Sequence, residues 1–116
     1  MEELTIHKNI DEDAWKNAGS NFFYKVQYFE LVGRLNTTTA KDFEKEMNQA
    51  LRVSEYITLN LSRVTLLTSV GIRIILKTYK QCHVRNGKFL LEDPSQPVKN
   101  VLGLSALEKM LGEWAC

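Results

Sequence analysis

One serine of the chain stands where chemistry can occur. Ser69 follows an apolar strand pattern and opens an amphipathic helical one. A hydroxyl at a helix start can cap the free backbone N–H groups of the first turn. It can also accept a phosphoryl group, because those N–H groups and the positive end of the helix dipole stabilise a phosphate there. Thr68 can be the cap and leave Ser69 free, or the two residues can take the opposite roles. From the residue types alone, capping is the more common outcome.

A phosphate on Ser69 would act through its charge. It adds about −1.5 to −2 charges at neutral pH. Arg73, one helical turn later, is placed to pair with it, and Gly71 leaves room for a close backbone approach. The unmodified surface would be mostly uncharged and would bind a partner, whereas the phosphate would repel an acidic partner surface. This mechanism needs no conformational change.

The residues that catalysis or metal binding would need do not form a motif. Ser69, His83 and Asp93 are the available types for a nucleophile with a base, but the sequence has no G-x-S-x-G elbow. His7 falls in a strand pattern and His83 on an apolar helical stripe, so we predict structural roles for both. The two histidines and two cysteines are scattered, at spacings that match neither a metal site nor a disulfide framework. We therefore expect no enzymatic activity, no metal and no cofactor.

Bulk composition describes an ordinary globular chain. Its 116 residues suffice for one domain, which we take to span residues 1–116, and 44% of them are hydrophobic. A net charge of +1 gives no general attraction to nucleic acid or to an anionic membrane. The N-terminus lacks the features of a signal peptide, and no apolar run reaches transmembrane length. We therefore expect a cytoplasmic protein that neither inserts into membranes nor binds nucleic acid.

Charged residues are unevenly distributed along the chain. No acidic residue occurs between Glu55 and Glu92, whereas the basic residues of that stretch are Arg63, Arg73, Lys77, Lys80, Arg85 and Lys88. The first half compensates with acidic groups at residues 11–13 and at Asp42, Glu44 and Glu46. Two interpretations stay open: two solvated faces of opposite sign, or a basic face for an acidic partner or a phosphate.

Hydrophobic periodicity predicts the elements that position these residues. Alternating residues predict a short strand over residues 3–9, followed by a polar turn with Trp15 as a candidate anchor. Tyr24, Val26 and Tyr28 alternate with polar neighbours, Gln27 among them, which indicates a long strand or a tight hairpin over residues 22–33. Three threonines, Thr37, Thr38 and Thr39, offer N-cap oxygens for an amphipathic helix over residues 38–53.

The second half alternates strands with helices. Residues 56–61 form a strand pattern, and a helix begins near Ser69 and stops at Asn86-Gly87. The apolar stripe of that helix consists of Ile72, Ile75, Leu76, Tyr79, Cys82 and His83, so we expect Cys82 to be buried and reduced. A strand over residues 88–92 precedes a helix opened by two prolines and a last helix capped by Ser105. This order predicts an α/β fold, a mixed β-sheet with some parallel pairing and helices packed against it.

Three regions, the last of them in two segments, resemble in order and spacing the motifs of the STAS domain (sulfate transporter and anti-sigma factor antagonist). Residues 56–72, YITLNLSRVTLLTSVGI, resemble the family's strand v-v-l-D-L-s-x-V, followed by f-m-D-S-S/A-G-l and a helix. Residues 29–40, FELVGRLNTTTA, resemble its turn l-x-G-x-l-D-x-x-t-a. The segments LLEDPSQPV at residues 90–98 and LEKML at residues 107–111 resemble its closing strand and helices. The resemblance covers residues 22–112.

The resemblance implies the role of an anti-sigma factor antagonist. In that family a serine at the start of the second helix is phosphorylated by an anti-sigma factor that is a serine-protein kinase, and a phosphatase resets it. By position this serine is Ser69. The resemblance also assigns the partner surface to the residues around it: Asn36, Thr37, Thr38, Thr68, Val70, Gly71 and Arg73.

Three positions depart from the family pattern. Asn36 and Thr68 stand where the family has acidic residues, so two negative charges near Ser69 are absent, and Val70 replaces a small residue. These departures leave an alternative open, in which the chain is a constitutive STAS interaction subunit, such as a stressosome scaffold or a lipid-transporter partner. A neighbouring gene for a kinase-type anti-sigma factor would favour the switch, and an ABC transporter operon would favour the subunit.

Overall fold

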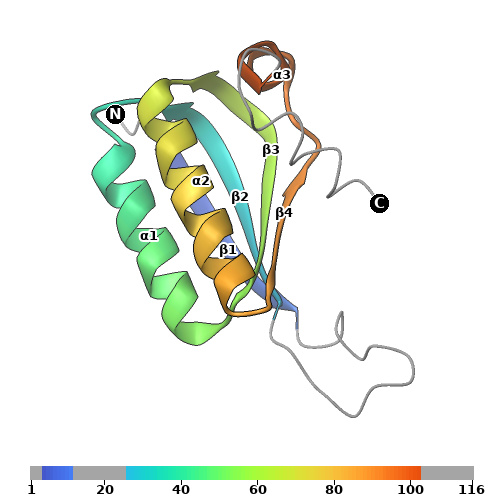
Figure 1. Cartoon of the computed structure of the whole chain (residues 1–116). Helices are drawn as coiled ribbons and strands as arrows, with labels where there is room; N and C mark the ends of the chain where they lie inside the picture. Colours follow the sequence, from blue (N-terminus) through green and yellow to red (C-terminus); the bar gives the residue numbers. More distant parts are fainter. Residues whose placement is uncertain (1–3, 12–25, 103–116) are drawn as a thin grey trace.

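The computed structural model describes residues 4–11 and 26–102 (Figure 1). The predicted order of strands and helices is confirmed over this part of the chain. The elements are β1 (Leu4–Asp11), β2 (Val26–Leu35), α1 (Ala40–Val53), β3 (Tyr56–Leu67), α2 (Ser69–Val84), β4 (Lys88–Glu92) and α3 (Gln96–Leu102). Trp15, residues 22–25 and the helix expected from Ser105 lie outside the described residues.

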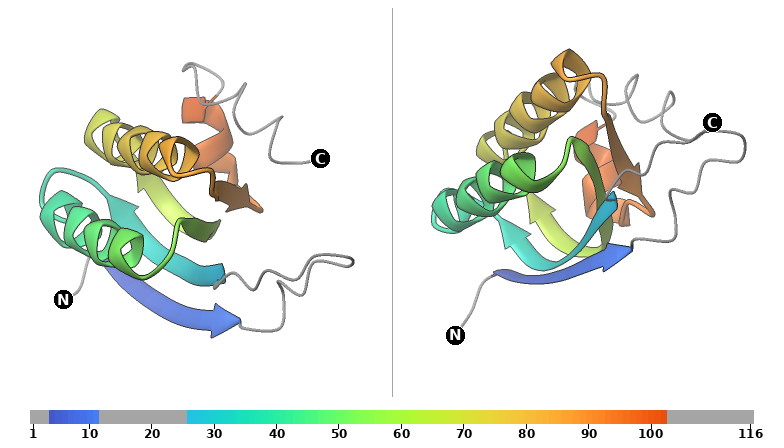
Figure 2. Two further views of the ribbon diagram at one scale, coloured as in Figure 1. Left: turned by 60° about the horizontal axis from the view of Figure 1, so that its bottom comes forward. Right: turned by 90° about the horizontal axis from the view of Figure 1, so that it is seen from below.

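The four described strands form one mixed sheet in the order β1-β2-β3-β4. β1 pairs with β2 antiparallel, whereas β2 with β3 and β3 with β4 pair parallel. Each parallel pair needs a crossover, which α1 and α2 supply. Both helices lie side by side across one face of the sheet (Figure 2). The predicted α/β class and mixed pairing are therefore confirmed.

The core lies between this face and the two helices. α1 buries its apolar side, as its spacing predicted, with Phe43 and Met47 at most 1% exposed. The sheet and the other helices contribute further buried side chains, among them Phe29, Leu31, Ile57, Leu59, Leu61, Ile75, Phe89 and Val98. Cys82 is buried among them as a free thiol, as expected, and its burial raises the pKa of that thiol to about 12.

In β2, the polar residue of the predicted alternation faces the core. Gln27 is buried, whereas Val26 and Tyr28 on the opposite face are only half-buried. Gln27 can occupy this position because its Nε2 donates a hydrogen bond of 2.8 Å to the carbonyl oxygen of Ala50, near the end of α1. The same carbonyl oxygen also accepts a 3.0 Å hydrogen bond from the N–H of Ser54, so the Gln27 amide is its second donor.

The predicted buried stripe of α2 is wrong in its last member. His83 is exposed and stacks on Tyr79, with ring centroids 6.0 Å apart. The buried side of the helix instead includes Ile74 and Thr78. Thr78 fits there because its hydroxyl donates a 2.8 Å hydrogen bond to the carbonyl oxygen of Ile74, one turn earlier. His7 lies on β1, as predicted for a strand residue, and is also exposed.

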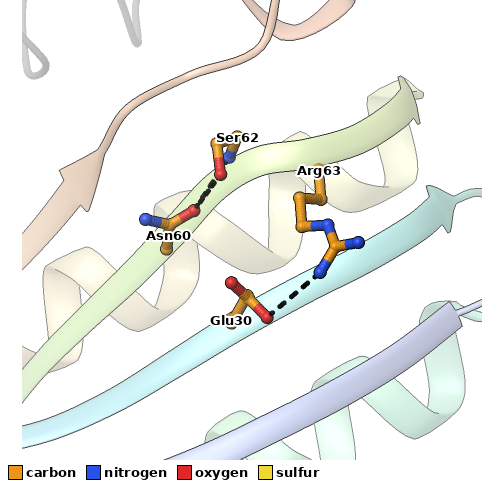
Figure 3. Close-up of polar contacts among 4 residues, drawn as sticks. All are labelled: Glu30, Asn60, Ser62 and Arg63. Atoms are coloured by element: carbon orange, nitrogen blue, oxygen red, sulfur yellow. Dashed lines mark hydrogen bonds and ion pairs between the residues drawn. The ribbon is translucent and has the colours of Figure 1, made fainter.

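β3 continues six residues beyond the predicted 56–61 strand, to Leu67. The pairing with β2 shifts between Glu30 and Val32, so that two residues of β3 oppose one of β2, as in a β-bulge. Asn60 supports the bulge, since its Oδ1 accepts two hydrogen bonds from Ser62, one from the backbone N–H at 3.0 Å and one from the hydroxyl at 2.6 Å (Figure 3). Arg63 lies 3.9 Å from the Glu30 carboxylate across the two strands. The bulge therefore lets β3 run on to the start of α2.

The end of α2 confirms the predicted stop at Asn86-Gly87. Asn86 adopts a positive φ of 61°, and its N–H donates to the carbonyl oxygen of His83 at 3.0 Å. The N–H of Gly87 donates to the carbonyl oxygen of Cys82 at 2.7 Å. These two bonds form a Schellman motif, which ends the helix and turns the chain into β4.

Candidate functional site

The β2–α1 turn is held by the side chain of Asn36. Its Oδ1 accepts hydrogen bonds from the backbone N–H groups of Thr38 at 3.0 Å and Thr39 at 3.1 Å. The hydroxyl of Thr39 donates to the carbonyl oxygen of Arg34 at 2.8 Å and accepts from the N–H of Asn36 at 3.0 Å. The sequence predicted that one of three threonines caps this helix. Thr39 does occupy the N-cap position, but its side chain makes no capping hydrogen bond to α1. Thr37 and Thr38 are exposed at the tip.

Thr68 joins this turn to the start of α2. Its backbone N–H and its hydroxyl each donate a 3.0 Å hydrogen bond to the carbonyl oxygen of Leu35, the residue before Asn36. Thr68 occupies the N-cap position of α2 in extended conformation, yet its side chain makes no capping bond. The two segments therefore meet at the same end of the sheet, seen at the top of Figure 1.

Gly71 allows α2 to pack closely against both strands. A Cβ atom at this position would lie 2.8 Å from Leu67 Cδ1 and 3.1 Å from Leu35 Cβ, closer than ordinary carbon contacts. Gly71 itself is buried. The close approach in the structure is to Leu35 and Leu67, inside the molecule, and an approach to a phosphate on Ser69 stays a prediction.

Ser69 is the first residue of α2 and is exposed. The helix's own bonding begins with the N–H of Ile72, which donates to the carbonyl oxygen of Thr68 at 3.1 Å. Helix geometry leaves the N–H groups of Ser69, Val70 and Gly71 without an intrahelical acceptor. The first turn contains no acidic residue. An anion on Ser69 would therefore meet unneutralised helix-dipole charge.

The fold brings together the residues that the sequence analysis assigned to one surface. Asn36, Thr37 and Thr38 lie in the β2–α1 turn, and Thr68, Ser69 and Val70 in the adjoining start of α2. Arg73 is exposed one turn along α2. Gly71 belongs to the packing beneath this surface.

Sequence reasoning missed two features beside Ser69. Leu66 is 40% exposed, large for an apolar residue. A groove of about 380 Å³ also runs between α1 and α2, starting at Val70. Helical spacing places residues 40, 41 and 44 on one side of the first helix and residues 70, 73, 74 and 77 on one side of the second. The sequence does not show that these two sides meet, because only the fold places the helices next to each other.

Residues 4–11 and 26–102 contain neither a candidate metal site nor a candidate membrane span. No group of three or more His, Cys, Asp or Glu side chains in this part of the chain is arranged to hold a metal ion. None of the described helices is long and apolar enough to cross a bilayer.

Comparison with known proteins decides the family. The model of the STAS domain matches residues 23–114. The chain belongs to the STAS domain family. This STAS domain has Ser69 at the start of α2 and Asn36 in the β2–α1 turn.

Solved structures share the fold of this STAS domain. SpoIIAA, an anti-sigma factor antagonist, is similar in its unphosphorylated form with a TM-score of 0.64 and 21% identity, over 77% of this chain and 76% of SpoIIAA. Bacillus SpoIIAA in its phosphorylated form has a TM-score of 0.62 and 21% identity, over 77% and 78% of the two chains. An anti-sigma factor antagonist from Mycobacterium paratuberculosis has a TM-score of 0.65 and 21% identity, over 91% and 82%. At these identities the likeness establishes the fold.

Proposed function

We propose that this STAS domain is an anti-sigma factor antagonist that works by partner switching. Unmodified, it binds an anti-sigma factor of the serine-kinase type through the surface around Ser69. Phosphorylation of Ser69 by that kinase ends the interaction, and a phosphatase restores it. The protein acts by binding and catalyses no reaction. The observation that carries this proposal is the exposed hydroxyl of Ser69 at an uncapped helix N-terminus, in a chain of the STAS family.

The local electrostatics favour a phosphate on Ser69. Three backbone N–H groups and the helix dipole face it, and no acidic side chain in the first turn opposes it. Its charge of about −1.5 to −2 would be the dominant change on a surface of hydroxyls, an amide and apolar groups, with Arg73 as its charged member. SpoIIAA, which shares the fold, has been solved in both phosphorylated and unphosphorylated forms.

Two of the three departures from the family pattern, Asn36 and Thr68, are compatible with this role. Asn36 offers an amide oxygen where an acidic residue would offer a carboxylate oxygen, and it accepts both turn hydrogen bonds. Thr68 donates to the carbonyl oxygen of Leu35, which an ionised carboxylate cannot do. Both residues thus support the shape of the surface without adding a negative charge to it.

The same two residues support a second candidate function, a constitutive interaction subunit. If selection maintains a neutral surface rather than a switch, Ser69 is simply an exposed helix-start residue. A stressosome scaffold or a lipid-transporter partner would then bind permanently through it. The gene neighbourhood separates the candidates, as a kinase-type anti-sigma factor and an ABC transporter operon point to different partners.

The deciding test is the intact mass of the protein. It is measured after purification from its own host and after incubation with the candidate kinase and ATP. We expect the mass of one phosphate in the wild type, its loss in Ser69→Ala and its retention in Ser62→Ala, which changes an exposed serine on β3. An unmodified wild type, under conditions that phosphorylate a known antagonist, would reject the switch and leave the constitutive subunit. Phosphate retained in Ser69→Ala would place the modification elsewhere.

A further inference from the structure

The groove between α1 and α2 has an apolar floor and a basic rim. Its volume is about 380 Å³. The lining residues are Ala40, Lys41, Glu44, Val70, Arg73, Ile74 and Lys77. Its apolar members come from both helices, so the floor is continuous with the core beneath.

The charges on the rim are not balanced. Lys77 forms an ion pair with Glu44, with 3.3 Å between Nζ and Oε2. Within the described residues, Lys41 and Arg73 make no ion pair, and both are exposed. Glu44 is the one acidic side chain that lines the groove, against three cations. The rim therefore retains two positive charges beside an apolar surface.

The basic character extends beyond the groove. A second hollow of about 360 Å³ continues along α1 and adds Lys45 and Arg52 to the shared Lys41 and Glu44. On the other side, α2 carries no acidic residue along its whole length. The acidic residues of α1 are divided: Glu44 meets Lys77 in the groove, whereas Asp42 and Glu46 line a separate hollow against β1.

We infer that this groove binds an acidic, amphipathic segment of the protein partner. Apolar side chains of the segment would contact Ala40, Val70 and Ile74, and its carboxylates would pair with Lys41 and Arg73. The inference rests on the proposed function, because the groove begins at Val70 and so continues the surface of Ser69. A polypeptide suits the lining better than a nucleic acid, since no aromatic side chain is there to stack on bases.

Arg73 links the groove to the switch. It lines the groove and lies one helical turn from Ser69. A phosphate on Ser69 competes with the segment's carboxylates for this guanidinium and repels them. Phosphorylation therefore weakens binding in the groove as well as at the helix start.

The test uses a defined probe and the full chain. The probe is a peptide of about four helical turns, roughly 15 residues, with glutamates on one face and leucines on the other. A matched peptide replaces every glutamate with glutamine. Two-dimensional amide NMR of the labelled protein follows each titration. We expect the acidic peptide to shift the signals of residues 40–44 and 70–77, and the glutamine peptide to bind at least about fivefold more weakly.

Charge-reversal variants locate the contact. Arg73→Glu should weaken binding of the acidic peptide at least about fivefold, because it removes an attraction and adds a repulsion. Lys80→Glu is the matched control, as it makes the same change at an exposed position of α2 that does not line the groove. Raising the NaCl concentration from about 0.05 M to about 0.5 M should weaken wild-type binding, since salt screens exposed charges.

Three results would overturn the inference: equal affinity for both peptides, shifts outside the two helices, or equal losses in Arg73→Glu and Lys80→Glu. None of these results involves Ser69. If the protein is phosphorylated but its groove does not bind the acidic peptide, the proposed switch stands and the proposed groove interaction is rejected. If the acidic peptide binds but the protein is never phosphorylated, the groove proposal stands and the groove is part of a constitutive interface.

Discussion

At the scale of single residues, Asn36 shows how a neutral side chain can replace an acidic one without loss of structure. One side-chain oxygen holds two backbone N–H groups of the turn beside Ser69. Because an amide oxygen and a carboxylate oxygen accept hydrogen bonds in the same geometry, the turn does not need the charge. Its shape and its charge are therefore separable by mutation.

We expect Asn36→Ala to lower the free energy of unfolding by about 1 kcal/mol, because two N–H groups lose their acceptor. Asn36→Asp should unfold at the same or a higher urea concentration, since the carboxylate retains both bonds and lies near the start of α1. Urea denaturation followed by circular dichroism measures both. If the alanine variant were as stable as the wild type, the turn would be held by its threonines alone.

At the scale of elements, the connection from α2 to β4 is packed closely against Glu55. Asn86 takes the left-handed conformation there, with φ of 61°, and Gly87 follows it. A Cβ atom on Gly87 would overlap the carbonyl oxygen of Glu55 and lie 2.5 Å from its Cγ. That carbonyl accepts a 3.1 Å hydrogen bond from the N–H of Lys88, so it cannot move without disturbing the start of β4.

We expect Gly87→Ala to destabilise the protein by about 1–3 kcal/mol through overpacking. Asn86→Gly is the neighbouring control, and it should change stability little, because glycine adopts a positive φ without strain. Thermal unfolding of both variants compares them directly. Equal melting temperatures for Gly87→Ala and the wild type would mean that the turn relaxes freely, against the packing described for Glu55.

The elements that sequence patterns predicted well are those whose signals are local. β4 was predicted at its observed bounds, and the α2 stop at Asn86-Gly87, because turn residues mark them. Period-2 alternation could not say which face of β2 meets the helices, so the burial of Gln27 depended on the distant Ala50 carbonyl. The extension of β3 likewise depended on pairing with β2 across a bulge.

The candidate site likewise has parts that the sequence predicts and parts that only the fold reveals. Ser69, Thr68 and Asn36 were recognisable from motifs, whereas their connection through the Leu35 carbonyl required the parallel pairing of β2 with β3. The exposure of Leu66 and the groove depended on how strands and helices pack. Contacts between residues far apart in sequence are set by the whole fold, which local patterns do not encode.

At the scale of the whole molecule, Ser69 is attached to a surface that the fold holds rigidly from beneath. Gly71 packs against Leu35 and Leu67, and Thr68, the N-cap residue of α2, is bonded twice to Leu35 of β2. The side chain of Ser69 is exposed and makes no contact that the core depends on. A charge placed there should therefore alter the surface alone, and the switch should operate without a change of fold.

This expectation can be tested by changing the charge at Ser69. A negative charge in the first turn interacts favourably with the helix dipole by about 0.3–1 kcal/mol, and a positive one unfavourably. Ser69→Asp should therefore be slightly more stable than wild type and Ser69→Lys slightly less, with Ser69→Asn between them as the neutral control. Salt should reduce the difference, because the charge is exposed to solvent. Amide NMR shifts in Ser69→Asp should be confined to residues 34–38 and 66–74. Shifts that reach β1, β4 or α3 would instead mean that phosphorylation changes the fold, since within residues 4–11 and 26–102 these elements make no hydrogen bond with the start of α2.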